Sequence, residues 1–84
     1  MKICFITFRS VTYGQSGQRV LQRAGLDARL LRTPRHLEER GCGYCLRLPM
    51  EAGLPAVEQL RRSGVPFRGV YVMLADGSAE EVSL

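Results

Sequence analysis

Cysteine is scarce and odd in number, with three thiols among 84 residues. An odd count fits poorly with the closed disulfide framework of a small secreted domain, and thiols in a reducing compartment are more often catalytic, metal-binding or structural. Long apolar runs are also missing, because no segment approaches the roughly 18 residues of a membrane span. The opening stretch MKICFITF meets an arginine after eight residues, which is too short for a secretory signal. We therefore expect a cytoplasmic protein without a membrane partner.

Lysine occurs only once, and no series of aromatic residues alternates with the basic ones. The sequence therefore does not favour nucleic acid as a partner. The net charge is nevertheless +4, and the last residues, 76–84, are acidic. A local basic field attracts anions such as acidic proteins and small oxyanions. Most of the positive surplus lies in the middle of the chain, at Arg29, Arg32, Arg35, Arg40 and Arg47.

The length and an apolar content of 45% predict one small folded domain. Apolar residues spaced as in a helix lie between Tyr13 and Ala24, where Ser10 or Thr12 can cap the start and Gly25 the end. Gly14 and Gly17 weaken this helix, so we expect its first turn either to fray or to approach another element closely. A second helix is expected over residues 52–64, ending at Gly64. Strands are expected over residues 2–8, 27–34, 44–49 and 67–74.

A weak internal repeat supports a fold of two similar halves. The segment LQRAGLDAR at 21–29 aligns with LRRSGVPFR at 60–68, and each combines a helix end, a glycine and the entry to a strand. The order βαββαβ predicts an α+β fold, the ferredoxin-like two-layer sandwich with a four-stranded antiparallel sheet and two helices on one face. We expect residues 1–74 to form this domain and 75–84 to be a loose acidic tail.

Cys42 lies between Gly41 and Gly43. Flanking glycines leave a thiol unshielded and allow unusual backbone angles. Positive charge nearby in the sequence, at Arg35 and Arg47, favours thiolate over thiol. This combination suits a nucleophile or a sulfur carrier, although a loop cysteine between turn glycines is the structural alternative.

Cys45 forms a Cys-x-x-Cys spacing with Cys42, which suits a redox pair or half of a zinc site. Cys45 is expected to enter a strand, however, where it shares a face with Arg47. This strand geometry would hold the Cys42 and Cys45 side chains apart unless the glycine loop folds back. A complete zinc site would have only Cys4 and His36 as further ligands. His36 could instead polarise the Cys42 thiol or simply face water. A lone cysteine in an apolar strand, such as Cys4, is usually a small buried hydrophobe.

The segments LLRTPRHL, CGYCLRL and SGVPFRGVY resemble a family of small bacterial proteins described as selenium/sulfur carrier-like, across about residues 1–74. The most specific part is Thr33-Pro34-Arg35, followed by Cys42-Gly43 and Leu46-Arg47. The resemblance implies that Cys42 is the carrier thiol, that Pro34 and Arg35 shape or charge its loop, and that Gly43 keeps it accessible. It leaves Cys45 outside the shared motif. The chain departs from the family by having Glu38 and Glu39 where serines are expected.

We therefore expect a sulfur or selenium carrier that accepts an atom from a donor protein and passes it to an acceptor protein. Such a relay uses one reactive cysteine, Cys42, and needs no bound cofactor or metal. It would act as a carrier or accessory protein more than as a turnover enzyme. Two alternatives stay open: an interaction module that presents the open sheet face or the basic loop, and a metal-binding protein that uses Cys42 and Cys45. A sheet with edge strands and one open face is also compatible with a homodimer.

Overall fold

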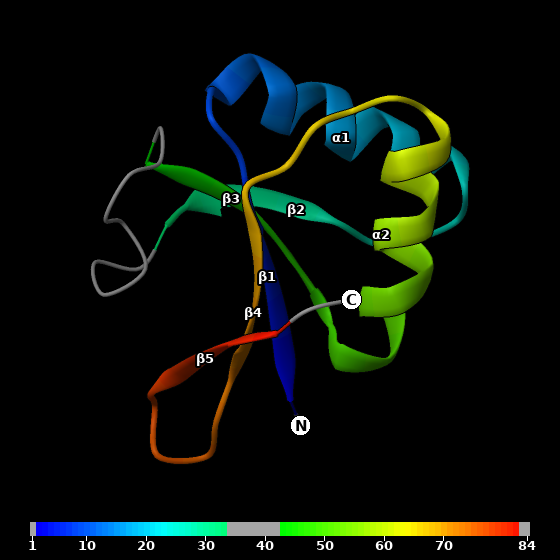
Figure 1. Cartoon of the computed structure of the whole chain (residues 1–84). Helices are drawn as coiled ribbons and strands as arrows, with labels where there is room; N and C mark the ends of the chain where they lie inside the picture. The colour runs from blue at the N-terminus through cyan, green and yellow to red at the C-terminus, as the bar shows by residue number, and fades with distance from the viewer. Residues whose placement is uncertain (1, 34–42, 83–84) are drawn as a thin grey trace.

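A computed structural model describes residues 2–33 and 43–82 of the chain. These residues form two helices and five strands (Figure 1). The predicted element order βαββαβ is confirmed, and one further strand follows it. The elements are β1 (Ile3–Thr7), α1 (Val11–Arg23), β2 (Arg29–Arg32), β3 (Tyr44–Pro49), a 3₁₀ turn η2 (Met50–Ala52), α2 (Gly53–Arg62), β4 (Gly69–Met73) and β5 (Ala79–Val82).

The strands form one antiparallel sheet in the order β2-β3-β1-β4-β5. β1 and β3 therefore each have neighbours on both sides, as predicted. The prediction of a four-stranded ferredoxin-like sheet was wrong, because β5 adds a fifth strand beside β4. Residues 79–82, which we predicted from the sequence to lie in a loose tail, thus belong to the sheet.

A tight turn explains why the acidic C-terminal segment forms a strand. The Gly77 N–H donates to the Leu74 carbonyl (3.0 Å), and Gly77 has φ +86°, which favours glycine. The Asp76 carboxylate accepts a hydrogen bond from the Ser78 N–H at 2.9 Å. These contacts bring Ala79 opposite Met73 and start the β4–β5 ladder. An Asp-Gly pair is a strong hairpin signal, and it could have revealed β5 from the sequence.

The ends of both helices are as predicted. The Ser10 hydroxyl accepts a hydrogen bond from the Tyr13 N–H at 3.2 Å, so Ser10 is the N-cap of α1, and Thr12 lies inside the helix. Gly25 and Gly64 follow α1 and α2 with φ of +81° and +70°. Glycine adopts this left-handed conformation at little cost, which is why each helix ends two residues before its glycine.

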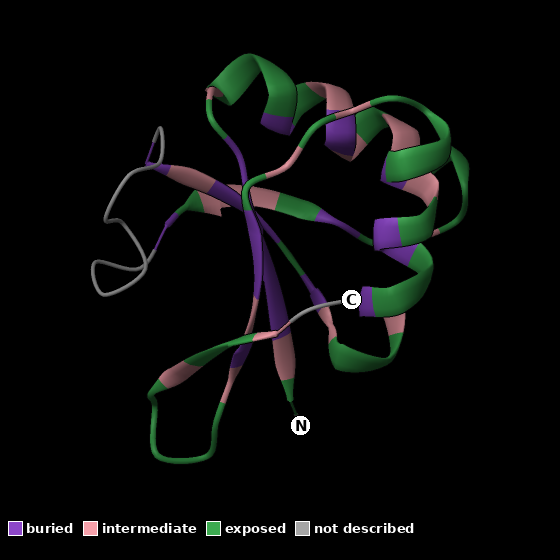
Figure 2. Cartoon of the chain, in the orientation of Figure 1, coloured by how far each residue is buried: buried purple, intermediate pink, exposed green. Residues whose placement is uncertain are grey.

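The core lies between the two helices and one face of the sheet (Figure 2). Alternate strand residues point to this face, such as Ile6 and Leu46, which are opposite each other in the β1–β3 ladder. They pack with residues on the inner sides of the helices: Leu21, Ala56, Val57 and Leu60. No helix in residues 2–33 or 43–82 is long and apolar enough to cross a membrane.

Helix α1 packs close to the sheet because two of its buried positions are glycines. A Cβ placed on Gly17 would be 3.0 Å from the Cζ atom of Phe8, and one on Gly14 would be 3.1 Å from Leu30 Cδ1. Of the two alternatives for these glycines, a frayed first turn or a close approach to another element, the structure shows the close approach. Phe8 is fully buried beneath the helix as a result.

Candidate functional site

The predicted carrier loop starts and ends at two backbone positions that hydrogen-bond to each other. The Thr33 N–H donates to the Gly43 carbonyl at 2.8 Å, one step beyond the Arg32–Tyr44 pair that ends the β2–β3 ladder. Thr33 and Gly43 are both buried. Gly43 has φ +84°, so glycine at this position serves the backbone geometry at the entry to β3. We call the Thr33–Gly43 pair the loop base.

Several of the predicted site residues lie outside the part of the chain that the structure describes. These are Pro34, Arg35, His36, Gly41 and Cys42. Gly43, Cys45 and Arg47 lie within it. Cys42 is bonded directly to Gly43, and this places the candidate thiol next to the loop base in the sequence.

Cys45 is a fully buried residue of β3. Its register partners are Thr7 on β1 and Leu31 on β2, so the three residues share the face opposite the helices. The side chain is 0% exposed, and the prediction that it lies on a strand is confirmed. The neighbouring Thr7 hydroxyl donates to the Gly69 carbonyl at 3.3 Å. Because it is buried, the Cys45 thiol is not exposed for direct exchange with a partner protein.

Cys4 belongs to the hydrophobic core, as the sequence predicted. It is 1% exposed, and its Sγ lies 3.3 Å from the position that a Cβ on Gly53 would occupy. Burial raises the pKa of the Cys4 thiol above its ordinary value. The protonated form therefore predominates near neutral pH, and it is a poor nucleophile.

The described residues form no group of three or more histidine, cysteine, aspartate or glutamate side chains that could hold a metal ion. Cys4 and Cys45, two of the candidate zinc ligands, are on different faces of the sheet, because Cys4 aligns with Leu48 whereas Cys45 aligns with Thr7. The other two candidates, His36 and Cys42, lie outside the described residues.

A positively charged side chain, Arg32, lies next to the loop base. The Arg32 guanidinium carbon is 5.6 Å from the centre of the Tyr44 ring, within the range of a cation–π contact. Arg32 and Tyr44 are also the last register pair of the β2–β3 ladder. Arg32 is one of the basic residues noted in the sequence, but it was not predicted to belong to the site, because the register of β2 against β3 could not be read from local spacing.

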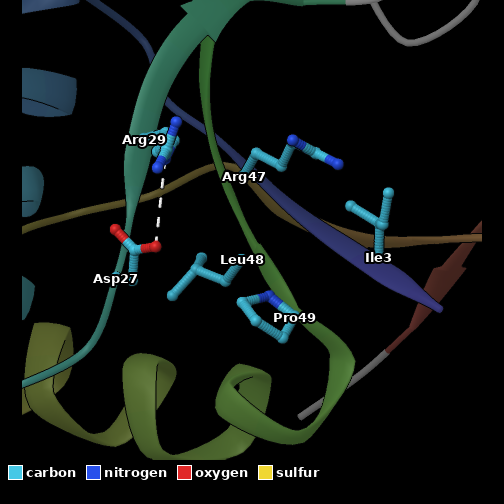
Figure 3. Close-up of a pocket in the computed structure, with 6 residues that line it drawn as sticks. All are labelled: Ile3, Asp27, Arg29, Arg47, Leu48 and Pro49. Carbon is cyan, nitrogen blue, oxygen red and sulfur yellow. Dashed lines mark ion pairs between the residues drawn. The ribbon is translucent and has the colours of Figure 1, made fainter. Parts of the chain in front are cut away.

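Arg47 lies on β3 at some distance from the loop base. It is exposed on the open face and stands four residues beyond Gly43, about 13 Å along a strand. Its register partner on β2 is Arg29. Both arginines line a pocket of about 330 Å³, together with Ile3, Asp27, Leu48 and Pro49 (Figure 3). Arg29, which the sequence did not single out as a site residue, thus shares a surface with Arg47.

Comparison with family models found a match to the family described as "Putative Se/S carrier protein-like", over residues 3–72. Neither a search of curated proteins nor a search of solved structures found a match. The matched range runs from the first residue of β1 into β4 and includes both helices and the loop base. The chain therefore belongs to the Se/S carrier-like family.

Proposed function

We propose that the protein relays sulfur or selenium through the Cys42 thiolate. The observation that carries this proposal is membership of the Se/S carrier-like family over residues 3–72. The Cys42 thiolate attacks the outer sulfur of a persulfide on a donor protein. The donor S–S bond breaks, the donor keeps the electron pair as a thiolate, and Cys42 becomes a persulfide.

The second half of the relay returns Cys42 to its starting state. A nucleophile of the acceptor attacks the outer sulfur of the Cys42 persulfide, the S–S bond breaks, and the Cys42 thiolate leaves. One sulfur atom has moved and no net oxidation has occurred. A selenium atom could follow the same route, because the steps are the same nucleophilic displacements.

The environments of the other two thiols support the choice of Cys42. Cys4 and Cys45 are 1% and 0% exposed, so neither can meet a thiol of another protein without opening of the fold. The loop base supplies a fixed support, since Gly43 directly follows Cys42 and its carbonyl is hydrogen-bonded to Thr33. Arg32 adds a positive charge at this end of the sheet, which favours a thiolate there.

Intact-mass spectrometry tests the relay directly. We expect the protein to gain about 32 Da, one sulfur atom, after incubation with a cysteine desulfurase and free cysteine, and to lose it on reduction. The variant Cys42→Ser should gain nothing. The matched variant Cys45→Ala, which removes a buried thiol, should load as the parent does. Loading that persists in Cys42→Ser, or that is absent from the parent protein, would rule out the relay.

A further inference from the structure

One residue from each strand lies in a single line across the face of the sheet opposite the helices. The registers of the four strand pairs connect these residues directly, from neighbour to neighbour. We call this line the transverse row. In spatial order it consists of Arg29, Arg47, Phe5, Tyr71 and Glu81.

The transverse row has opposite charges at its two ends. Arg29 and Arg47 lie at the β2 end and Glu81 at the β5 end, separated by two aromatic residues. The Glu81 carboxylate lies on this face, because its Oε2 is 3.0 Å from the position that a Cβ on Gly69 would occupy. The Tyr71 ring is 3.1 Å from the same position, so the ring and the carboxylate lie side by side. Within the described residues, neither Arg47 nor Glu81 has an ion-pair partner.

The two arginines form an unfavourable pair in the isolated chain. Like charges directly opposite each other on neighbouring strands destabilise a sheet. Asp27 offsets part of this, with a carboxylate oxygen 3.9 Å from Arg29 Nε, and Figure 3 shows that contact beside the extended Arg47. Two guanidinium groups and one carboxylate leave one positive charge in the pocket. One further carboxylate would neutralise it.

We propose that a second copy of this chain supplies that carboxylate. In this dimer, a two-fold axis runs parallel to the strands and passes over Phe5. It places the transverse rows of the two copies face to face, with the order of residues reversed in one of them. Arg29 of each copy then meets Glu81 of the second copy. Arg47 of each copy meets Tyr71 of the second copy in a cation–π contact. An isologous interface repeats each contact twice, so the row is complementary to itself.

The rest of the molecule favours this face over the sheet edges. The helices cover the other face, and Phe5 is only 4% exposed, so Arg47 and Tyr71 form the contact surface around the axis. Pairing two copies through β2 would bring arginines together, and pairing them through β5 would bring glutamates together. Face-to-face docking with the row reversed avoids both repulsions.

Charge reversal tests the proposed pairing. We expect sedimentation velocity to show a monomer–dimer equilibrium that shifts toward monomer as salt is raised, because exposed ion pairs are screened. Arg29→Glu and Glu81→Arg should each raise the dimer dissociation constant about tenfold or more, since each places like charges together twice. A one-to-one mixture of the two variants should restore the dimer, because the mixed pair has only opposite charges in contact. Arg29→Gln and Glu81→Gln should give smaller increases in the dissociation constant.

Glu80→Arg is the matched control, because Glu80 is also exposed on β5 but aligns with Val72 on the helix side of the sheet. It should leave the dissociation constant unchanged. A protein that stays monomeric, an equal effect of Glu80→Arg, or a mixture that fails to restore the dimer would overturn the proposal. Binding of a polyglutamate peptide to a chain that remains monomeric would also overturn it, by assigning the arginines to an acidic partner.

Discussion

At the scale of single residues, the environment of each cysteine separates its possible roles. Cys4 is buried in the core on the helix side of the sheet. Cys45 is buried on the opposite face, between its register partners Thr7 and Leu31. Cys4 packs as a small apolar group, the usual use of a buried cysteine, and Cys45 is 0% exposed. The chemistry proposed for the chain therefore falls to Cys42.

Gly17 is the residue at which an added methyl group should cost most. Gly17→Ala would place a Cβ 3.0 Å from Phe8 and 3.3 Å from Leu46, and both side chains are fully buried. We expect overpacking to lower the free energy of unfolding by about 1–3 kcal/mol. A gain of about 1 kcal/mol in helix propensity should offset only part of this loss. Chemical denaturation should show a lower free energy of unfolding.

Gly14→Ala is the matched comparison for this substitution. Its closest contact, at 3.1 Å, is a single methyl group of Leu30, a partly buried side chain that can rotate away. The loss of stability should be smaller than at Gly17. A Gly17→Ala protein as stable as the parent would contradict the close packing of α1 against Phe8.

At the scale of elements, the β4–β5 hairpin depends on a turn with an ionised side chain. The pKa of Asp76 is lowered by the hydrogen bond from the Ser78 hydroxyl and then by that from the Ser78 N–H. A lowered pKa contributes stability above the ordinary aspartate value, about 3.9, and the contribution is lost as pH falls through the lower folded value. Acid should therefore loosen the turn.

Hydrogen-exchange protection factors of the β5 amides should report this loosening. We expect protection to fall below about pH 4 in the parent protein. In Asp76→Ala protection should already be low, without that pH step. Glu58→Ala, which removes an exposed carboxylate on α2, serves as the control. The same pH step in Asp76→Ala and in the parent would show that Asp76 is not responsible.

Local signals predicted most of the elements, and the two features that were missed, β5 and the surface shared by Arg29 and Arg47, depend on how strands pair. Ser10, Gly25 and Gly64 act through their own backbone neighbourhood, so the helix ends could be predicted. The segment AEEV has little strand character by itself and becomes a strand because the edge of β4 pairs with it. The shared surface of Arg29 and Arg47 depends on the register of two strands distant in sequence.

At the scale of the whole molecule, the two proposals depend on different parts of β2 and β3. The loop base lies at the Thr33–Gly43 end of β2 and β3. The transverse row crosses the sheet at Arg29 and Arg47, several residues away along the same strands. Cys42→Ser should therefore abolish sulfur loading without affecting dimerisation, and Arg29→Glu should do the reverse. Failure of one proposal would leave the other standing.

The central claim, that thiol reactivity belongs to Cys42, is tested most directly by alkylating the native protein over a range of pH and mapping the modified peptides. We expect Cys42 to react near neutral pH. Cys45 should stay protected by burial, and Cys4 by burial and its raised pKa, until the protein is unfolded. A Cys42 thiol that is inert near neutral pH, or one that reacts only after Cys4 or Cys45, would contradict the account.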